Sequence, residues 1–508
     1  MSATKPLIAL VRGPVVSSRR SINNEATPCL AFACLSAVLH KHGWETVWVD
    51  AIGEGLDQIH PLPDFPGYVG QGLTLAEAVA LIPAGAGIVA FSGMFSSEWP
   101  VMRELIRLAR RRLPGALFVS GGEHVTALPE YSLRDCPELD VIVRGEGEGP
   151  LLNLVESHAA GHSFDGIEGL AFRGAAGEFV RGGGVTRIRE IDEIPWLRWP
   201  DGYLEKFWAA GKSFGAGTAR DLPFLASRGC PYRCTFCSSP AMWTTRYSLR
   251  APEDCVAEIR HHVERSRVTC VQFYDLTAMT KRSWIHRFCE LLIAEKLDVS
   301  WSLPSGTRSE VLDGETLALM KRAGCRYLVY APESGSTQTL KRIQKQISLP
   351  KLEESVREAR RLGMSVRTNL IMGFPGETPR QLAQTLRFAL RMAVRGVDDI
   401  ALFLFTPYPG SALFEELLAA GRVRLSDGFL LKQASAQGDF FSPVPSYADG
   451  IGPRVLAALR LTAMMTLYAV GYSLHPRRFL RTVRNVLWGD ESQTVLEHRL
   501  QDLIRRQF

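Results

Sequence analysis

The chain has 508 residues, of which 46% are hydrophobic and 22% charged, and its 59 basic and 53 acidic residues give a formal net charge of +6. The length predicts two to four domains, and the composition excludes a disordered or membrane-embedded chain. The charge excess is small and dispersed, so we expect no nucleic acid partner, and ten cysteines are too few for a disulfide scaffold. The N-terminus has no signal pattern, so we expect a cytoplasmic protein, and we take it to be a monomer.

The first 155 residues alternate short apolar runs with helical patterns. Continuous apolar strands separated by helices are typical of a parallel sheet that is covered on both faces. We therefore expect residues 1–155 to form a doubly wound, Rossmann-like α/β domain. The candidate strands are 7–11, 45–50, 87–91, 116–119 and 140–143.

The ends of these strands carry glycines beside polar residues. Ligands of a parallel sheet bind beyond the carboxyl ends of the strands, where glycine lets the backbone approach them closely. The alternative is that these glycines only form the tight turns that any such fold requires. The residues concerned are Arg12, Gly13, Ser92, Gly93, Gly121, Gly122, His124, Gly145, Glu146 and Gly147.

Residues 156–221 have a weak pattern and are expected to be an irregular linker. Residues 222–410 then repeat a strand–helix unit six times. Five crossovers between six parallel strands predict a partial (β/α)6 barrel, because an eight-unit barrel would need more chain. The expected strands are 224–228, 271–276, 299–303, 327–331, 366–372 and 400–405, and the expected helices are 252–265, 283–294, 314–323, 351–362 and 379–393.

Three cysteines, Cys230, Cys234 and Cys237, follow the first barrel strand with the spacing Cys-x3-Cys-x2-Cys. Three thiolates from one loop can hold three irons of a 4Fe-4S cluster and leave the fourth iron open to a substrate or cofactor. The alternative is a structural zinc site, which needs a fourth ligand at a recognisable spacing. The later cysteines are scattered singly, which favours the cluster.

The cysteine motif, with Phe236 before its last cysteine, resembles the signature of the radical S-adenosylmethionine (SAM) enzymes. The glycine-rich strand ends ahead of it are similar to those of the cobalamin-dependent members, and this resemblance covers roughly residues 5 to 410. It implies a 4Fe-4S cluster, SAM, cobalamin and an electron donor such as a flavodoxin or ferredoxin. No Asp-x-His-x-x-Gly follows the first strand, which implies that cobalt is bound without a protein histidine.

Polar and glycine-rich segments after the later barrel strands are similar to the SAM-binding segments of this family. Arg367 is positioned to pair with the methionyl carboxylate, which would be a charge-assisted contact. The alternative is that these segments are turns and helix starts on their own. The second barrel strand ends in Asp275 without the usual Gly-Gly-Glu. The candidate SAM-binding residues are Phe236, Glu333, Ser334, Arg367, Gly373 and Gly376.

The tail, residues 411–508, is expected to be mostly helical. Residues 455–474 are apolar apart from Arg460 and small polar residues, and four arginines follow, at 477, 478, 481 and 484. The uninterrupted apolar run is too short to span a bilayer. The segment either covers the open side of the barrel or lies on a membrane surface as a peripheral contact.

The resemblance implies a methyltransferase. In this reaction a reduced cluster donates an electron to SAM, a 5′-deoxyadenosyl radical abstracts hydrogen from an unactivated carbon, and methylcobalamin supplies the methyl group. We expect the substrate to be a small apolar or amphipathic molecule. Two alternatives remain: a radical oxidative cyclase or rearrangement enzyme of the anaerobic tetrapyrrole-cyclase type, and a non-enzymatic cobalamin-binding sensor.

Overall fold

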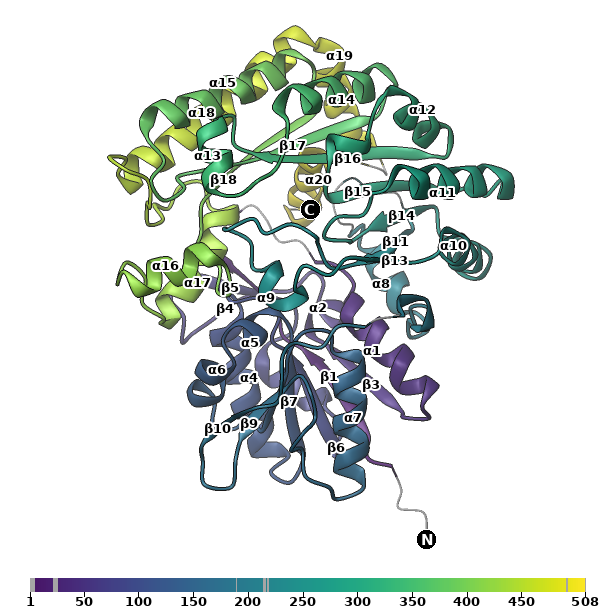
Figure 1. The fold of residues 1–508 in the computed structure, drawn as a ribbon, viewed down its shortest axis with the longest axis vertical. Coiled ribbons are helices and arrows are strands. Elements are labelled where there is room, and N and C mark those ends of the chain that lie inside the picture. Colours follow the sequence, from purple (N-terminus) through teal and green to yellow (C-terminus); the bar gives the residue numbers. More distant parts are fainter. Residues whose placement is uncertain are drawn as a thin grey trace.

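The structure is a computed structural model that describes residues 5–21, 26–188, 190–212, 216, 219–489 and 492–507. Two α/β domains lie one against the other, with the N-terminal domain below and the barrel domain above in Figure 1. The tail helices, coloured yellow-green to yellow, pack around the barrel.

The sheet of the N-terminal domain has seven strands in the order β10-β9-β8-β7-β6-β1-β3. Five neighbouring strands pair in parallel and the hairpin β9–β10 is antiparallel. All five predicted strands are present, so the doubly wound class is confirmed. The seven strands are β1 (Leu7–Arg12), β3 (Thr46–Asp50), β6 (Ala86–Ser92), β7 (Leu117–Gly121), β8 (Val141–Val143), β9 (Leu170–Arg173) and β10 (Phe179–Arg181).

Helices cover both faces of this sheet. Alternate strand residues explain this, because Ile8 and Leu10 pack in one core cluster and Ala9 and Val11 in the other. A three-stranded antiparallel sheet, β2 (Val15–Ser18), β5 (Tyr68–Gln71) and β4 (Ile59–Pro61), is appended and was not predicted. The helices on the first face are α1 (Leu30–Lys41) and α7 (Glu148–Ala159), and those on the second are α3 (Leu75–Leu81), α4 (Trp99–Arg112) and α6 (Pro129–Asp135).

The barrel sheet has six parallel strands in chain order, with β11 and β18 at its two open edges. The partial barrel is therefore confirmed. Its strands are β11 (Asp221–Phe224), β14 (Cys270–Phe273), β15 (Ser300–Thr307), β16 (Cys325–Glu333), β17 (Ser365–Met372) and β18 (Asp399–Leu404). The helices that cover it are α10 (Pro252–Ser266), α11 (Arg282–Glu295), α12 (Gly314–Arg322), α14 (Leu349–Arg361) and α15 (Pro379–Val394).

The first barrel strand differs from the predicted 224–228. β11 ends at Phe224, and β12 (Ser227–Arg228) pairs separately with β13 (Ser248–Leu249). The reason is Asp275, whose buried carboxylate accepts the backbone N–H of Ala226 at 3.1 Å and the hydroxyl of Ser227. These bonds draw the chain out of the barrel sheet before the cysteine loop begins.

The stretch expected to be a linker, 156–221, supplies the β9–β10 hairpin and α8 (Tyr203–Ala209). Tyr203 joins this stretch to the first domain, because its hydroxyl donates to Asp50 at 2.6 Å and accepts the N–H of Cys29 at 2.9 Å. The linker therefore packs along the first domain as part of its fold.

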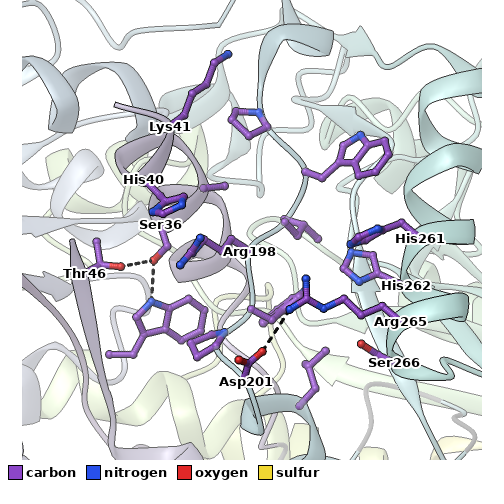
Figure 2. Close-up of a pocket in the computed structure, with 18 of the residues that line it drawn as sticks. Ser36, His40, Lys41, Thr46, Arg198, Asp201, His261, His262, Arg265 and Ser266 are labelled. Carbon is purple, nitrogen blue, oxygen red and sulfur yellow. Dashed lines mark hydrogen bonds and ion pairs between the residues drawn. The ribbon is translucent and has the colours of Figure 1, made fainter. Parts of the chain in front are cut away.

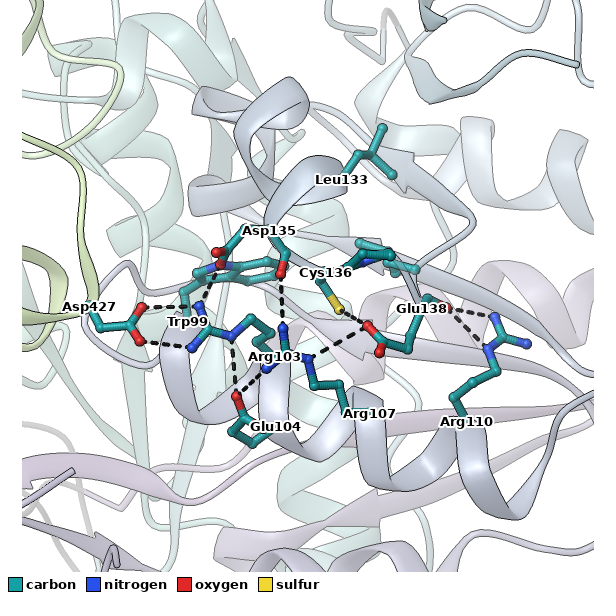
Figure 3. Close-up of polar contacts among 12 residues, drawn as sticks. Trp99, Arg103, Glu104, Arg107, Arg110, Leu133, Asp135, Cys136, Glu138 and Asp427 are labelled. Carbon is teal, nitrogen blue, oxygen red and sulfur yellow. Dashed lines mark hydrogen bonds and ion pairs between the residues drawn. The ribbon is translucent and has the colours of Figure 1, made fainter. Parts of the chain in front are cut away.

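The described part of the tail forms five helices, as expected for a helical segment. α17 returns to the N-terminal domain, where Asp427 receives two bonds from Arg103 of α4, at 3.0 and 2.8 Å. Figure 3 shows Arg103 between Asp427 and Asp135 of α6, so this one guanidinium ties three helices together. The tail helices are α16 (Ala412–Ala419), α17 (Asp427–Gly438), α18 (Pro453–Leu474), α19 (Pro476–Trp488) and α20 (Val495–Gln507).

α18 is the one helix among the described residues with the length and apolar composition of a membrane span. It is nevertheless docked within the protein, because Tyr468 donates its hydroxyl to Asp399 of β18 and Arg460, which is 1% exposed, donates to the carbonyls of Ala436 and Asp439 at the end of α17. Of the four arginines beyond it, Arg478 and Arg481 turn inward and reach Asp398. Two of the four arginines after the apolar segment therefore serve the interior of the protein.

Candidate functional site

The cysteine loop lies directly after β12, and all three thiols are partly exposed. The N–H of Cys237 donates to the carbonyl of Cys234 at 3.1 Å, which closes a turn between them. Thr235 fixes this turn to the barrel, because its N–H donates to the carbonyl of Ile343 at 3.0 Å and its carbonyl accepts the N–H of Leu413 at 2.9 Å. The loop is thus held by the segment after β16 and by the start of the tail.

The three thiols are close enough to influence one another. Burial raises the pKa of Cys234 and raises the pKa of Cys237 to about 11. A neighbouring thiolate adds to each shift, because the charge of Cys230 raises the pKa of Cys234 and the charge of Cys234 raises the pKa of Cys237. Bound iron would reverse these shifts, because metals bind the thiolate.

The arrangement of the thiols fits a cluster and does not fit zinc. Among the described residues, no group of three or more His, Cys, Asp or Glu side chains is arranged to hold one metal ion. A structural zinc site needs ligands that converge on one point, whereas a cubane takes one thiolate per iron. The donor set, three thiolates on one loop with no fourth protein ligand beside them, therefore suits a 4Fe-4S cluster.

Two predicted SAM-binding residues, Phe236 and Glu333, lie beside this loop. The ring of Phe236 contacts that of Phe374 edge to face, with centroids 5.6 Å apart. Glu333 ends β16 and forms a buried ion pair of 3.0 Å with Lys345, whose ammonium is 6.0 Å from the Phe236 ring. Glu333 has φ of 65°, a left-handed conformation that is costly for a residue with a side chain and clusters at functional sites.

Arg367 points toward the inner face of the barrel. Its neighbours Val366 and Thr368 are fully buried, and Val366 belongs to the core beneath the covering helices, so the alternation of β17 turns Arg367 the other way. Its Nε donates to the side-chain oxygen of Asn369 at 2.8 Å. The strand thus presents a cationic group to the lumen.

Gly373 and Gly376 form the turn that follows β17, with φ of 90° and 70°. The N–H of Gly373 donates to the buried carboxylate of Glu377 at 2.7 Å, and a Cβ at Gly373 would lie 2.7 Å from a methyl carbon of Leu456 in α18. Burial raises the pKa of Glu377 to about 7. The left-handed turn and the close approach of α18 are therefore sufficient, without a ligand, to explain why residue 373 is glycine.

Ser334 has no free hydroxyl for a ligand. Its Oγ is 2.9 Å from Oγ1 of Thr385 and accepts the N–H of Ser336 at 3.1 Å, and the residue is fully buried. Ser334 thus anchors the loop after β16 to α15.

The predicted cobalamin-binding glycines lie at the carboxyl ends of β6, β7 and β8, which neighbour one another in the sheet. The N–H of Gly93 donates to the carbonyl of Gly121 at 2.7 Å, and Gly122 has φ of 122° with Gly93 so close that a Cβ would lie 2.8 Å from its backbone. Ser92 ends β6 directly before Gly93. Two adjacent strand-end loops therefore need glycine to pass each other.

His124 is directed into the protein at the start of α5 (Glu123–Ala127). Its Nδ1 is 2.9 Å from the hydroxyl of Ser96, and its ring stacks on Trp99 with centroids 4.9 Å apart. Burial lowers the pKa of His124 to about 3, so the imidazole is neutral. Its side chain packs against α4 and supports the glycine turn from behind.

The remaining predicted polar groups are also engaged within the protein. Glu146 accepts from Arg187 at 2.9 Å and from the N–H of Ile188, while Gly145 has φ of 78° and forms a bridge with Thr186. Gly147 precedes α7. These residues join the last parallel strand to the stretch that leads into the barrel.

Arg12 ends β1 and Gly13 follows it. Arg12 donates to the carbonyl of Thr27 at 2.7 Å and lies 3.7 Å from Asp50. A Cβ at Gly13 would lie 3.2 Å from the terminal methyl of Met102. The arginine side chain thus pairs inside the domain at the position where related domains carry a cobalt-binding histidine.

The N-terminal domain contacts the cysteine loop directly, which sequence reasoning missed. Ser238, the residue after Cys237, donates its hydroxyl to Glu123 at the start of α5, and Arg228, just before the loop, pairs with Glu148 at the start of α7 at 2.7 Å. Both glutamates directly follow the glycine-rich strand ends. The only signal in the sequence was that acidic residues accompany these glycines.

A large cavity of about 1030 Å³ lies elsewhere, between α1, α10 and residues 192–205. Figure 2 shows its polar lining, in which Asp201 and Arg265 form an ion pair of 3.4 Å. None of the predicted cofactor-binding residues lines it. The walls of this cavity carry both acidic and basic side chains, and no residue of the cysteine loop lines it.

Comparisons with known proteins identify two families in the chain. Residues 24–155 match the B12 binding domain, and residues 224–389 match the radical SAM superfamily. The chain is 29% identical to an uncharacterized methyltransferase of Pyrococcus horikoshii, over 81% of this chain and 83% of that one. It is 27% identical to cytidylyl-2-hydroxyethylphosphonate methyltransferase of Streptomyces wedmorensis, over 84% of each chain.

A third relative is named as a cyclase and not as a methyltransferase. Anaerobic magnesium-protoporphyrin IX monomethyl ester cyclase of Cereibacter sphaeroides is 30% identical over 62% of this chain but only 51% of its own length. Among solved structures, the methyltransferase TsrM of Kitasatospora setae, with cobalamin and a [4Fe-4S] cluster bound, superposes with a TM-score of 0.64 at 18% identity, over 92% and 89% of the two chains. OxsB, with aqua-cobalamin and SAM bound, gives 0.61 at 17% identity, over 92% and 62%. These structures share the fold.

Proposed function

The chain belongs to the cobalamin-dependent radical SAM enzymes, and we propose that it transfers a methyl group to an unactivated carbon of a small apolar or amphipathic molecule. Two methyltransferase relatives cover more than four-fifths of both chains, whereas three cyclase relatives match 51%, 55% and 74% of their own lengths. Methyl transfer is therefore favoured over ring formation, which stays the second candidate.

The observation that carries this proposal is the contact of Glu123 with Ser238. It brings the carboxyl ends of the first sheet against the residue that follows Cys237. When bound, the cluster supplies the electron that cleaves SAM, and cobalamin supplies the methyl group. A substrate held at this domain interface is within reach of both, which is the positioning such a reaction needs.

We assign the SAM site to the inner face of the barrel. Phe236 and Glu333 border the cysteine loop, Arg367 offers its guanidinium to the methionyl carboxylate, and the turn of Gly373 and Gly376 offers backbone to the nucleoside. Ser334 supports this wall from behind through Thr385.

The cobalamin site we place at the glycine-rich ends of β6, β7 and β8. The backbone of these turns would hold the ligand, while the side chains of Arg12, His124 and Glu146 hold the turns from within the domain. With Arg12 at the end of β1 and Gly13 after it, no histidine stands at the usual cobalt-binding position. A cobalamin bound here would therefore receive no ligand from a histidine of this loop.

The barrel lumen supports the proposed substrate class. Tyr327 and Val329, which alternate with residues of the outer core, form a small cluster with Val495 of α20. The tail thereby covers the inner wall and favours a small, largely apolar guest. We further infer that the protein receives electrons from a flavodoxin or ferredoxin, because the three cysteines are partly exposed. We also infer that it is a monomer.

The test is anaerobic incubation of the reconstituted enzyme with reductant, a cell extract and SAM that carries a deuterated methyl group. Mass spectrometry should find a product that has gained the labelled methyl. A Cys234→Ala variant serves as the control and should form none. A product that has lost hydrogen without gaining the label would contradict methyl transfer and support the cyclase reaction.

A further inference from the structure

Helix α19 is inverted with respect to an ordinary surface helix. Arg478, Thr482 and Asn485, spaced four and three residues apart, are buried, so its polar face points into the protein. Its apolar residues point outward instead. Surface helices of globular proteins bury their apolar stripe, so this arrangement calls for a partner outside the chain.

Two buried acidic residues fix this orientation. Arg478 donates to the carbonyl of Asp398 at 2.7 Å and Arg481 to its carboxylate at 3.0 Å. Glu497 of α20 accepts from Thr482 at 2.9 Å and from Asn485 at 3.0 Å. Turning α19 to hide its apolar side would leave these groups unpaired in the interior, which is costly.

The outward face of α19 is strongly apolar and well exposed. Leu480 is 66% exposed, Leu487 56% and Trp488 76%, and their spacing places them on one side of the helix. Leu474, the last residue of α18, is 54% exposed as well. We call these four residues the α19 surface.

The charged side chains on the outward side of α19 are both arginines. Arg477 and Arg484 are exposed on the same side of α19 as Leu480 and Leu487. From Pro453 to Trp488 the sequence has no aspartate or glutamate. The next acidic residues in the chain, 490 and 491, lie outside the described residues.

We propose that the α19 surface docks onto an anionic lipid bilayer, with α19 lying in the plane of the interface. An apolar face that also carries two arginines matches an acyl boundary beneath anionic headgroups, because the long arginine side chains can reach up to the headgroups, and α18, docked through Arg460, does not cross the membrane. This inference does not depend on the reaction catalysed.

The position of the surface keeps the catalytic end free. Asp398, which holds α19, directly precedes β18 and so marks the amino-terminal end of the barrel strands. The cysteine loop belongs to the opposite, carboxyl end. In Figure 1, α19 lies along the top, away from the N-terminal domain, so docking would not cover the domain interface.

The experiment measures co-sedimentation of the full-length protein with vesicles of phosphatidylcholine alone and of phosphatidylcholine with phosphatidylglycerol. We expect binding to the anionic vesicles that falls as salt is added. The triple variant Leu480→Ser, Leu487→Ser, Trp488→Ser should lower the apparent affinity by roughly tenfold or more. These side chains are exposed, so the fold should persist, and the thermal midpoint verifies this.

Two further variants make the result specific. Arg477→Gln with Arg484→Gln should remove the preference for anionic over neutral vesicles. Leu81→Ser, which changes a 50% exposed leucine of α3 in the other domain, should bind as the unchanged protein does. Absence of binding to anionic vesicles at low salt would overturn the proposal. So would a lipid-free dimer in analytical ultracentrifugation that the triple variant disperses, because a second copy would then cover the surface.

Discussion

At the scale of single residues, the three cysteines carry the strongest claim, because they are one loop's complete donor set for a cluster. Anaerobically reconstituted protein should hold about four irons and absorb broadly in the visible range. Changing Cys230, Cys234 or Cys237 to alanine should abolish both signals. Cys289→Ala, which alters a buried thiol outside the loop, is the matched control and should retain its iron.

Glu377 gives a prediction on pH dependence. Burial raises its pKa from 4.5 to about 7 in the folded protein, so the folded state binds the proton more tightly than the unfolded state. The associated stability is fully present below the unfolded pKa and is lost as the pH rises through the folded pKa. The loss is on the order of 3 kcal/mol between about pH 4.5 and pH 7.

Thermal unfolding at both ends of this range tests the shift. The Glu377→Gln variant, whose side-chain oxygen still accepts the Gly373 N–H, should lose less stability than the unchanged protein as the pH rises. Equal losses would show that the carboxylate titrates normally.

Residue roles were the least predictable part of the site. The cysteine spacing is a local pattern, so the sequence alone is enough to predict the cluster ligands. Ser334 and His124 were chosen from their places after strands, and only the structure shows that their polar atoms already serve Thr385 and Ser96. Which way a side chain points depends on partners distant in sequence, and single-sequence patterns do not contain them.

At the scale of elements, the arginines of α19 and the acidic residues beneath them hold the tail on the barrel. Asp398→Ala would leave Arg478 and Arg481 without their buried partner, and we expect a destabilisation of about 3–5 kcal/mol. Denaturant unfolding measures it. Asp201→Ala removes a surface ion pair and should cost at most about 1 kcal/mol, so similar losses in both variants would contradict the account.

The strands of both sheets were predictable because apolar runs and glycine turns are local. The strand expected at 224–228 was misplaced because Asp275, some fifty residues away, draws Ala226 out of the sheet. The tail could not be oriented from its sequence. Amphipathicity predicts which face of a helix is apolar, but Asp398 and Glu497 decide that the apolar face of α19 is the outer one.

At the scale of the whole molecule, the absence of a histidine after β1 bears on the cobalt. We expect the protein to bind about one equivalent of cobalamin without a protein nitrogen on the metal. Electron paramagnetic resonance of the cobalt(II) form should lack nitrogen superhyperfine splitting from an axial ligand. Splitting of that kind, retained in a His124→Gln variant, would show that another nitrogen occupies the lower face.

The central claim is that both domains act together on one carbon, so the stoichiometry of SAM consumption tests it most directly. One SAM is cleaved for the radical and another restores the methyl group, so each methylated product should accompany one 5′-deoxyadenosine and one S-adenosylhomocysteine. Quantitative mass spectrometry of anaerobic reactions measures all three. Equal amounts are the result we predict, whereas 5′-deoxyadenosine formed with product but without S-adenosylhomocysteine would contradict methyl transfer.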